Sequence, residues 1–233
     1  MEKDISNLFE KYSQSLDKLK EILQDELPRS LRLFDIRLRL AIDIQIDFAG
    51  EVSFTKTKEV RDTYALLIKL TESWNAYEAL YHYTKDIKKY VNTKEGIFQA
   101  YSQTFLKEVG SLDILKTTLD ALKSKYNDEN NFKDDFKELI KRIEDDERIK
   151  KKLTESCTSI IGYFEGNKDI SGVEIIALIY AERNMYYHNG ETAKMGMRYG
   201  NRKFVIKTLI SGFYKHILLM STKILDKEYD EKK

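Results

Sequence analysis

The segment RNMYYHNG at residues 183–190 holds residue types that phosphate chemistry needs. A histidine gains and loses a proton near neutral pH, so His188 suits general acid–base work. Arg183 suits a phosphate group, or the extra charge of a pentavalent phosphorus transition state. With Asn184 to orient them, these two groups could cleave RNA without a metal ion, and the ribose 2′-hydroxyl would supply the nucleophile.

The spacing of these residues decides which side chains can meet. On an α-helix Asn184 and His188 are four residues apart and share a face. Arg183 and His188 are five apart, so their side chains diverge by about 140° around a regular helix. We expect them to converge if the helix end loosens at Asn189–Gly190, or if a second copy of the segment faces the first.

The segment resembles the signature of the HEPN superfamily, which reads arginine, a polar residue, a short spacer and histidine, written R-x4-6-H. Arg183, Asn184 and His188 match it with four residues between arginine and histidine. The resemblance covers residues 172–225, where one more helix follows the motif. It implies a helical bundle that dimerises and pairs two motifs into one composite site. It also implies a metal-independent endoribonuclease, typically a toxin or antiviral defence effector, with these three residues as the catalytic set.

The motif departs from part of the family. HEPN toxins that a partner nucleotidyltransferase silences usually carry a tyrosine two residues after the histidine. Gly190 occupies that place here, and Tyr186 and Tyr187 lie inside the motif. The sequence therefore does not support regulation by such an antitoxin, although another antitoxin or a defence-complex partner stays open.

A basic cluster follows the motif in a polar loop that we expect over residues 191–203. Its members would contact phosphates and hold RNA across the site, with a tyrosine to stack on a base. An ordinary solvated loop is the alternative. The predicted substrate-binding residues are Lys194, Arg198, Tyr199, Arg202 and Lys203.

Simpler roles are open to the motif as well. Arg183 and His188 could form a helix-terminal ion pair or cap, with Glu182 or Glu191 as partner. The protein would then be a non-catalytic HEPN module that binds a nucleotide, an RNA or a protein partner within a larger complex. In a third interpretation the motif is accidental and the protein is purely structural.

Other chemistry finds little support in the sequence. There is no phosphate-binding glycine loop and no nucleophile elbow, and the three histidines are far apart, so we expect no metal and no cofactor. Cys157 is the only cysteine, which excludes a disulfide within the chain. His82 is expected at the surface or in packing, His216 in the core or an interface, and Trp74 in the core. A net charge of +1 excludes a global basic field.

Helices must position these residues. One proline and ten glycines in 233 residues favour an all-α protein. Apolar residues recur at helical spacing over 4–26, 58–90, 97–126, 132–164, 173–189 and 205–224, with turns expected at 127–131 and 166–169. Residues 173–181 are apolar nearly all round, as in a helix buried on most faces.

Residues 31–57 leave helix and strand open. From Ile36 to Phe48 apolar and polar residues alternate, which is the period of a strand. No partner strand is evident elsewhere, so context favours a helix.

The simplest organisation is one domain over 1–233, a HEPN-type bundle with additional N-terminal and middle helices. We expect a cytoplasmic homodimer that acts on RNA and makes no contact with a membrane, because no signal segment and no apolar run of about 18 residues is present.

Overall fold

The computed structural model describes residues 3–24, 26–46, 57–92, 97–189 and 194–233, and helices make up its regular structure. No strand occurs in these ranges, where the extended pairing is an isolated bridge between Val91 and Tyr101. The predicted all-α class is therefore confirmed. The helices are α1 (Lys3–Ile22), α2 (Arg29–Asp43), α3 (Lys58–Asp86), the 3₁₀ turn η1 (Ile97–Gln99), α4 (Gln103–Glu108), α5 (Ser111–Asp128), α6 (Asn130–Asp145), α7 (Lys151–Phe164), α8 (Glu174–Asn189) and α9 (Tyr199–Lys232).

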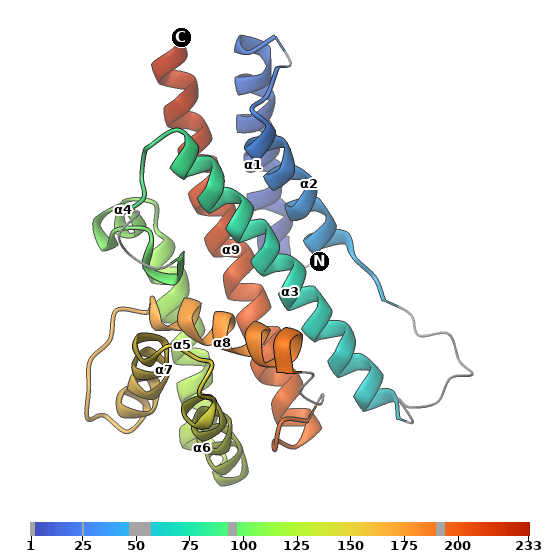
Figure 1. Ribbon diagram of the computed structural model, residues 1–233, viewed down its shortest axis with the longest axis vertical. Coiled ribbons are helices and arrows are strands. Elements are labelled where there is room, and N and C mark those ends of the chain that lie inside the picture. Colours follow the sequence, from blue (N-terminus) through green and yellow to red (C-terminus); the bar gives the residue numbers. More distant parts are fainter. Residues whose placement is uncertain (1–2, 25, 47–56, 93–96, 190–193) are drawn as a thin grey trace.

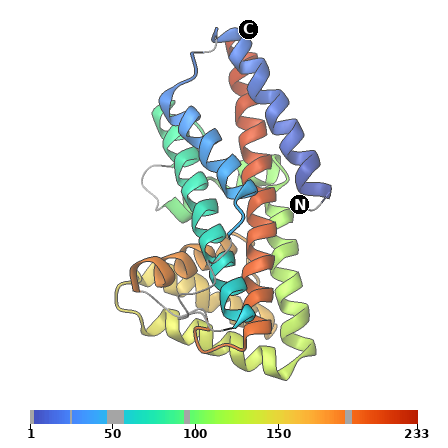
Figure 2. The ribbon, with the colours of Figure 1, turned by 90° about the vertical axis from the view of Figure 1, so that its right-hand side faces the viewer.

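Two groups of helices make up the fold (Figure 1). α1, α2, α3 and α9 form a long bundle in which α2 packs on α3 and α1 packs on α9. α5 joins the second group, α4 to α8, to this bundle by packing on α9, and α8 crosses the lower part of α3. In the view turned by 90°, α3 and α9 run side by side (Figure 2). The motif helix α8 thus lies across the long helices of the bundle.

α9 is the central helix of this arrangement. It has 34 residues and packs on α1, α3 and α5. Among the described helices it is the one whose length and composition would allow it to cross a membrane, but 67% of its most apolar 18-residue stretch is buried inside the protein. Its apolar character therefore follows from its place in the core.

The alternating segment that begins at Ile36 is helical as far as Asp43. Ile36 and Leu40, two members of the alternating set, are 61% and 42% exposed, so this set does not form one buried face. The strand period was misleading here, and the helical interpretation is right for α2. Residues 47–56 lie outside the described ranges. The buried stripe of α2 consists of Leu31, Phe34, Leu38, Ala41 and Ile42.

A lysine of α3 holds the end of α2. The Lys69 ammonium donates hydrogen bonds to the carbonyl oxygens of Ile42, at 3.0 Å, and Ile44, at 3.5 Å. A basic side chain at this place satisfies carbonyls that the last turn of a helix leaves free. Burial lowers the pKa of Lys69. This contact places the end of α2 beside the middle of α3.

Two loops are shorter than the sequence predicts. Between α5 and α6 only Glu129 is non-helical, although residues 127–131 have poor helix propensity. Phe132 and Phe136 of α6 are fully buried, and this packing outweighs local propensity. The predicted end of the loop over 191–203 is also wrong, because α9 begins at Tyr199. The predicted turn after α7 is confirmed by Gly166, whose φ is +77°.

α5 and α9 approach each other closely at a glycine. A Cβ atom at Gly212 would lie 2.1 Å from the Thr118 hydroxyl oxygen and 2.9 Å from its methyl group. The absence of a side chain at Gly212 therefore lets the two helices pack this tightly.

Candidate functional site

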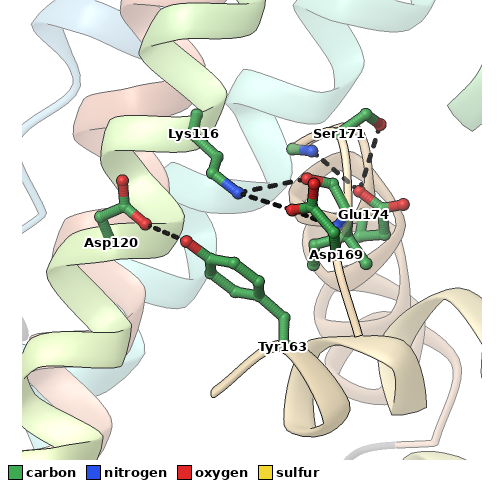
Figure 3. A network of polar contacts seen from close by, with 8 residues as sticks. Lys116, Asp120, Tyr163, Asp169, Ser171 and Glu174 are labelled. Atoms are coloured by element: carbon green, nitrogen blue, oxygen red, sulfur yellow. Dashed lines mark hydrogen bonds and ion pairs between the residues drawn. The ribbon is translucent and has the colours of Figure 1, made fainter. Parts of the chain in front are cut away.

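The start of the motif helix is fixed against α5 by a polar network (Figure 3). The Glu174 carboxylate accepts hydrogen bonds from the backbone N–H of Gly172 at 2.9 Å and from the Ser171 hydroxyl at 3.4 Å. The Lys116 ammonium of α5 donates to the carbonyl oxygen of Ile170 at 3.2 Å and lies 3.6 Å from the Asp169 carboxylate. An acidic group in the first turn also complements the helix dipole.

The same network includes the end of α7. The Lys116 ammonium lies 3.8 Å from the centre of the Tyr163 ring, and the Tyr163 hydroxyl donates to Asp120 at 2.6 Å. This hydrogen bond raises the pKa of Tyr163. Gly172 makes the close approach possible, because its φ is +106° and a Cβ there would lie 3.1 Å from the backbone nitrogen of Lys116. The entry to α8 is thereby tied to both α5 and α7.

The body of α8 is buried, as its apolar sequence predicts. Ile175 to Ile179 are at most 2% exposed. Aromatic contacts join α8 to α3, since Tyr180 lies 4.7 Å from Trp74 and Tyr186 lies 6.2 Å from Tyr64 between ring centres. These contacts set the position of the last two turns, which carry the motif.

A buried ion pair precedes the motif directly. The two terminal guanidinium nitrogens of Arg202, Nη1 and Nη2, donate to the Glu182 carboxylate, and both side chains have no exposed surface. The sulfur of Met195 accepts a further hydrogen bond from Arg202 at 2.9 Å. The assignment of Arg202 to substrate binding is therefore wrong, because a fully buried guanidinium bound to a carboxylate cannot reach a phosphate.

This pair also removes one of the simpler roles of the motif. Glu182 had been a candidate partner for Arg183 or His188 in a helix-terminal ion pair, and its carboxylate is bound to Arg202 instead. The other candidate, Glu191, lies outside the described residues, as does Gly190 at the expected end of the motif helix.

Arg183 is held at the half-exposed side of α8 by two motif neighbours. Its guanidinium donates to the Asn184 side-chain oxygen at 3.0 Å and lies 4.8 Å from the centre of the Tyr187 ring. Tyr187 is 62% exposed. A guanidinium that an amide and an aromatic ring hold from two sides has few conformations left to lose when it binds an anion. Asn184 thus contacts Arg183, and its role in orienting the site stays a prediction.

His188 lies in the last turn of α8, which ends at Asn189. Its description is limited to the backbone, so the meeting of Arg183 with His188 stays a prediction.

The predicted phosphate-binding residues do not form one patch. Lys194 is exposed and Tyr199 is half-buried at the start of α9. Arg198 pairs with Asp135 of α6 at 2.8 Å, with 57% of its side chain exposed. Lys203 faces α3, where its ammonium lies 3.6 Å from Asp62. The first turn of α9 is therefore anchored to α6, α8 and α3 by three basic residues, of which Arg198 retains the most exposed side chain.

The histidines outside the motif and the tryptophan lie where the sequence predicts. His82 is exposed, and Trp74 is in the core. His216 is buried, its Nδ1 is hydrogen-bonded to the Ser111 hydroxyl, and its Nε2 has no hydrogen-bond partner in the described part of the chain. Cys157 is buried, and desolvation together with the nearby Glu182 charge raises the pKa of its thiol, which makes it a poor nucleophile.

Sequence reasoning missed Tyr187 and the Glu182–Arg202 pair. A signal for the pair existed, because Arg202 precedes Val205, Ile206 and Leu209 by three, four and seven residues and so lies on the apolar face of α9. A charged residue on such a face needs a buried partner. The signal for Tyr187 is its spacing, because it is four residues from Arg183 and so lies on the same face of the helix. Comparison of the chain with protein-family models, curated proteins and solved structures gave no match.

Proposed function

We propose that the protein is a HEPN-type endoribonuclease that cleaves single-stranded RNA without a metal ion, as a toxin or antiviral defence effector. The observation that carries the proposal is the arrangement of Arg183, whose guanidinium Asn184 and Tyr187 hold at the half-exposed end of α8. An anion-binding group held in advance stabilises charge that develops during a reaction. The motif histidine follows in the same helix end.

The reaction needs one bond made, one bond broken and two proton transfers. The ribose 2′-oxygen attacks phosphorus, and its proton passes to a neutral imidazole of His188. Arg183 neutralises the charge on the phosphorane, and the bond from phosphorus to the 5′-oxygen breaks as that oxygen receives a proton from an imidazolium. The products are a 2′,3′-cyclic phosphate and a 5′-hydroxyl. Because Arg183 and His188 diverge on one regular helix, the complete set comes from two chains of a homodimer.

The test is incubation of the purified protein with single-stranded RNA in the presence of EDTA. The wild type should cleave the RNA and leave the product ends described above. Arg183→Ala and His188→Ala should each abolish cleavage while the circular dichroism spectrum stays unchanged. His82→Ala is the control, because it removes an exposed histidine outside the motif, and it should cleave as the wild type does. Cleavage by His188→Ala would overturn the mechanism.

A non-catalytic module is the second candidate, and one observation favours it. Of the four basic residues expected to bind RNA, Arg198, Arg202 and Lys203 contact carboxylates of the protein itself. A HEPN module of this kind would bind a nucleotide, an RNA or a protein partner through Arg183 and Tyr187. RNA binding without cleavage, weakened equally by Arg183→Ala and Tyr187→Ala, would support the module.

A further inference from the structure

α2 presents an apolar stripe to solvent that the fold does not use. Four large hydrophobic side chains are notably exposed in the described part of the chain, and three of them are Leu33, Ile36 and Leu40, at 48%, 61% and 42%. The fourth is Tyr187, on α8. An apolar stripe of this kind marks an interaction surface.

The spacing of the stripe is that of a helix-pairing seam. Leu33, Ile36 and Leu40 are separated by three and four residues and lie on one face, opposite Phe34, Leu38 and Ala41, which are buried in the bundle. Steps of three and four are how a and d positions recur along paired helices. The exposed face of α2 therefore has the pattern of a helix that packs on a second helix.

The charges around the stripe identify that second helix. Arg37 and Arg39 are neutralised within the chain, by Glu72 at 3.1 Å and Asp35 at 2.8 Å. Arg29 and Arg32 are exposed at the start of α2, and no carboxylate of the described residues lies within ion-pair distance of either. Asp43 is exposed at the opposite end, where the charge of Lys69 interacts with it without forming an ion pair. Among the described residues, the outer face of α2 thus carries unpaired positive charge at one end and a partly compensated negative charge at the other.

From this pattern we infer that α2 pairs with α2 of a second copy of the chain, antiparallel and with the two-fold axis at Ile36. In that register Arg29 faces Asp43 of the partner subunit, and Leu33 lies within one residue, about 1.5 Å along the axis, of Leu40 of the partner subunit. A parallel pair would bring like charges together at both ends. An anionic lipid surface would be attracted by Arg29 and Arg32 and repelled by Asp43, so the face complements itself better than it complements a membrane.

The size of the helix sets the strength of this dimer. α2 has 15 residues, which corresponds to a length of about 22 Å. One helix pair of this length buries less than the roughly 800 Å² per partner of a stable interface. The association is therefore weak and depends on protein concentration.

This interface is separate from the one that the proposed function requires. On α3, Lys69 contacts the end of α2 and Tyr64 contacts α8. The two residues are five positions apart, so their side chains point about 140° apart around the axis of α3. α2 and α8 thus lie on different sides of α3. Pairing through α2 therefore does not depend on RNA cleavage, and an experiment can contradict one of these two proposals without contradicting the other.

Cysteine cross-linking tests the register. Ile36→Cys places a thiol on the two-fold axis, within disulfide distance of its own copy, and should form a disulfide dimer under mild oxidation. Leu33→Cys should cross-link poorly with itself but readily when mixed with Leu40→Cys. The native Cys157 is buried and does not compete. Asp134→Cys, at an exposed position on α6, is the control. Cross-linking of Asp134→Cys as fast as that of Ile36→Cys would overturn the inference.

Charge reversal tests the ends of the pair in sedimentation experiments. The wild type should associate as its concentration rises, Arg29→Asp should weaken association, and Arg29→Asp with Asp43→Arg should restore it. Association that Arg29→Asp leaves unchanged, or that the double variant does not restore, would overturn the inference. A second result would also overturn the inference: the protein is monomeric and binds vesicles of equal parts phosphatidylserine and phosphatidylcholine, and Ile36→Lys abolishes this binding. RNA cleavage measured on the same α2 variants should equal that of the wild type.

Discussion

At the scale of single residues, the contact nearest to the motif that has structural consequences is the Glu182–Arg202 pair. Both side chains are fully buried, and they join α8 to α9 one residue before Arg183. Removing one partner of such a pair leaves an uncompensated charge in the core, whereas replacing both removes the cost of desolvating them.

Arg202→Met should therefore lower the free energy of unfolding by about 3–5 kcal/mol. Adding Glu182→Leu should recover most of that loss. Urea denaturation of the two variants measures the difference. Lys151→Met is the control, because it breaks an ion pair with Glu155 in which the two side chains are 90% and 64% exposed, and it should cost less than about 1 kcal/mol. A double variant as unstable as Arg202→Met would show that the charge is not the cause.

His216 makes stability depend on pH. Burial lowers its pKa from 6.5 to about 3, so the folded protein keeps this imidazole neutral where the unfolded chain protonates it. Between pH 6.5 and about 3 the unfolded state binds more protons, and stability falls as pH falls, by up to about 1.4 kcal/mol per pH unit. Above pH 6.5 this residue contributes no pH dependence.

The measurement is urea denaturation at a series of pH values. His216→Asn keeps a hydrogen-bonding atom near Ser111 and removes the titrating ring, so its stability should fall less steeply below pH 6.5 than that of the wild type. His82→Asn, at an exposed position, should retain the wild-type slope. Equal slopes in His216→Asn and the wild type would contradict the assignment.

At the scale of helices, the close contact of α5 with α9 depends on Gly212. Gly212→Ala should destabilise the protein by about 1–3 kcal/mol, because the new methyl group overlaps the Thr118 side chain and the helices must separate. The loss should appear as a lower midpoint in thermal unfolding. Thr118→Ala removes the two nearest atoms and should recover part of the loss when combined with Gly212→Ala. An effect of the two changes that is simply additive would exclude this contact as the cause.

Sequence periodicity predicts most helices but not where they end or how they are used. The apolar stripe of α9 is read correctly because each of its positions packs in the core. α2 gives a mixed signal because Ile36 and Leu40 keep an apolar character on the exposed face. The corner at Glu129 could not be predicted, because Phe132 and Phe136 gain their stabilisation from helices far away in the sequence.

In the candidate site, too, some contacts could be predicted from the sequence and others could not. The contact of Arg183 with Asn184 follows from adjacent residues and is within reach of sequence reasoning. The place of Arg202 on the apolar face of α9 indicates that it is buried, but its partner Glu182 follows from the contact of α8 with α9, which no local pattern encodes.

At the scale of the whole molecule, Trp74 reports on the junction of the two helix groups. It is the only tryptophan, is 1% exposed, and contacts Tyr180 of α8 and Phe213 of α9. Because α3, α8 and α9 meet at this side chain, we expect the helix groups to unfold together. Urea transitions followed by tryptophan emission and by far-ultraviolet circular dichroism should coincide. Helical signal that persists after the emission has changed would show that one group unfolds separately.

The position of α9 in the chain has a consequence for folding on the ribosome. The helices that α9 packs on, α1, α3 and α5, are all synthesised before it. Until α9 emerges they lack their shared partner, and Glu182 in α8 lacks the arginine that neutralises it. A nascent chain can therefore form α8 but cannot bury the carboxylate beside the motif. The synthesis of α9 thus sets the moment at which Arg183 reaches its final surroundings.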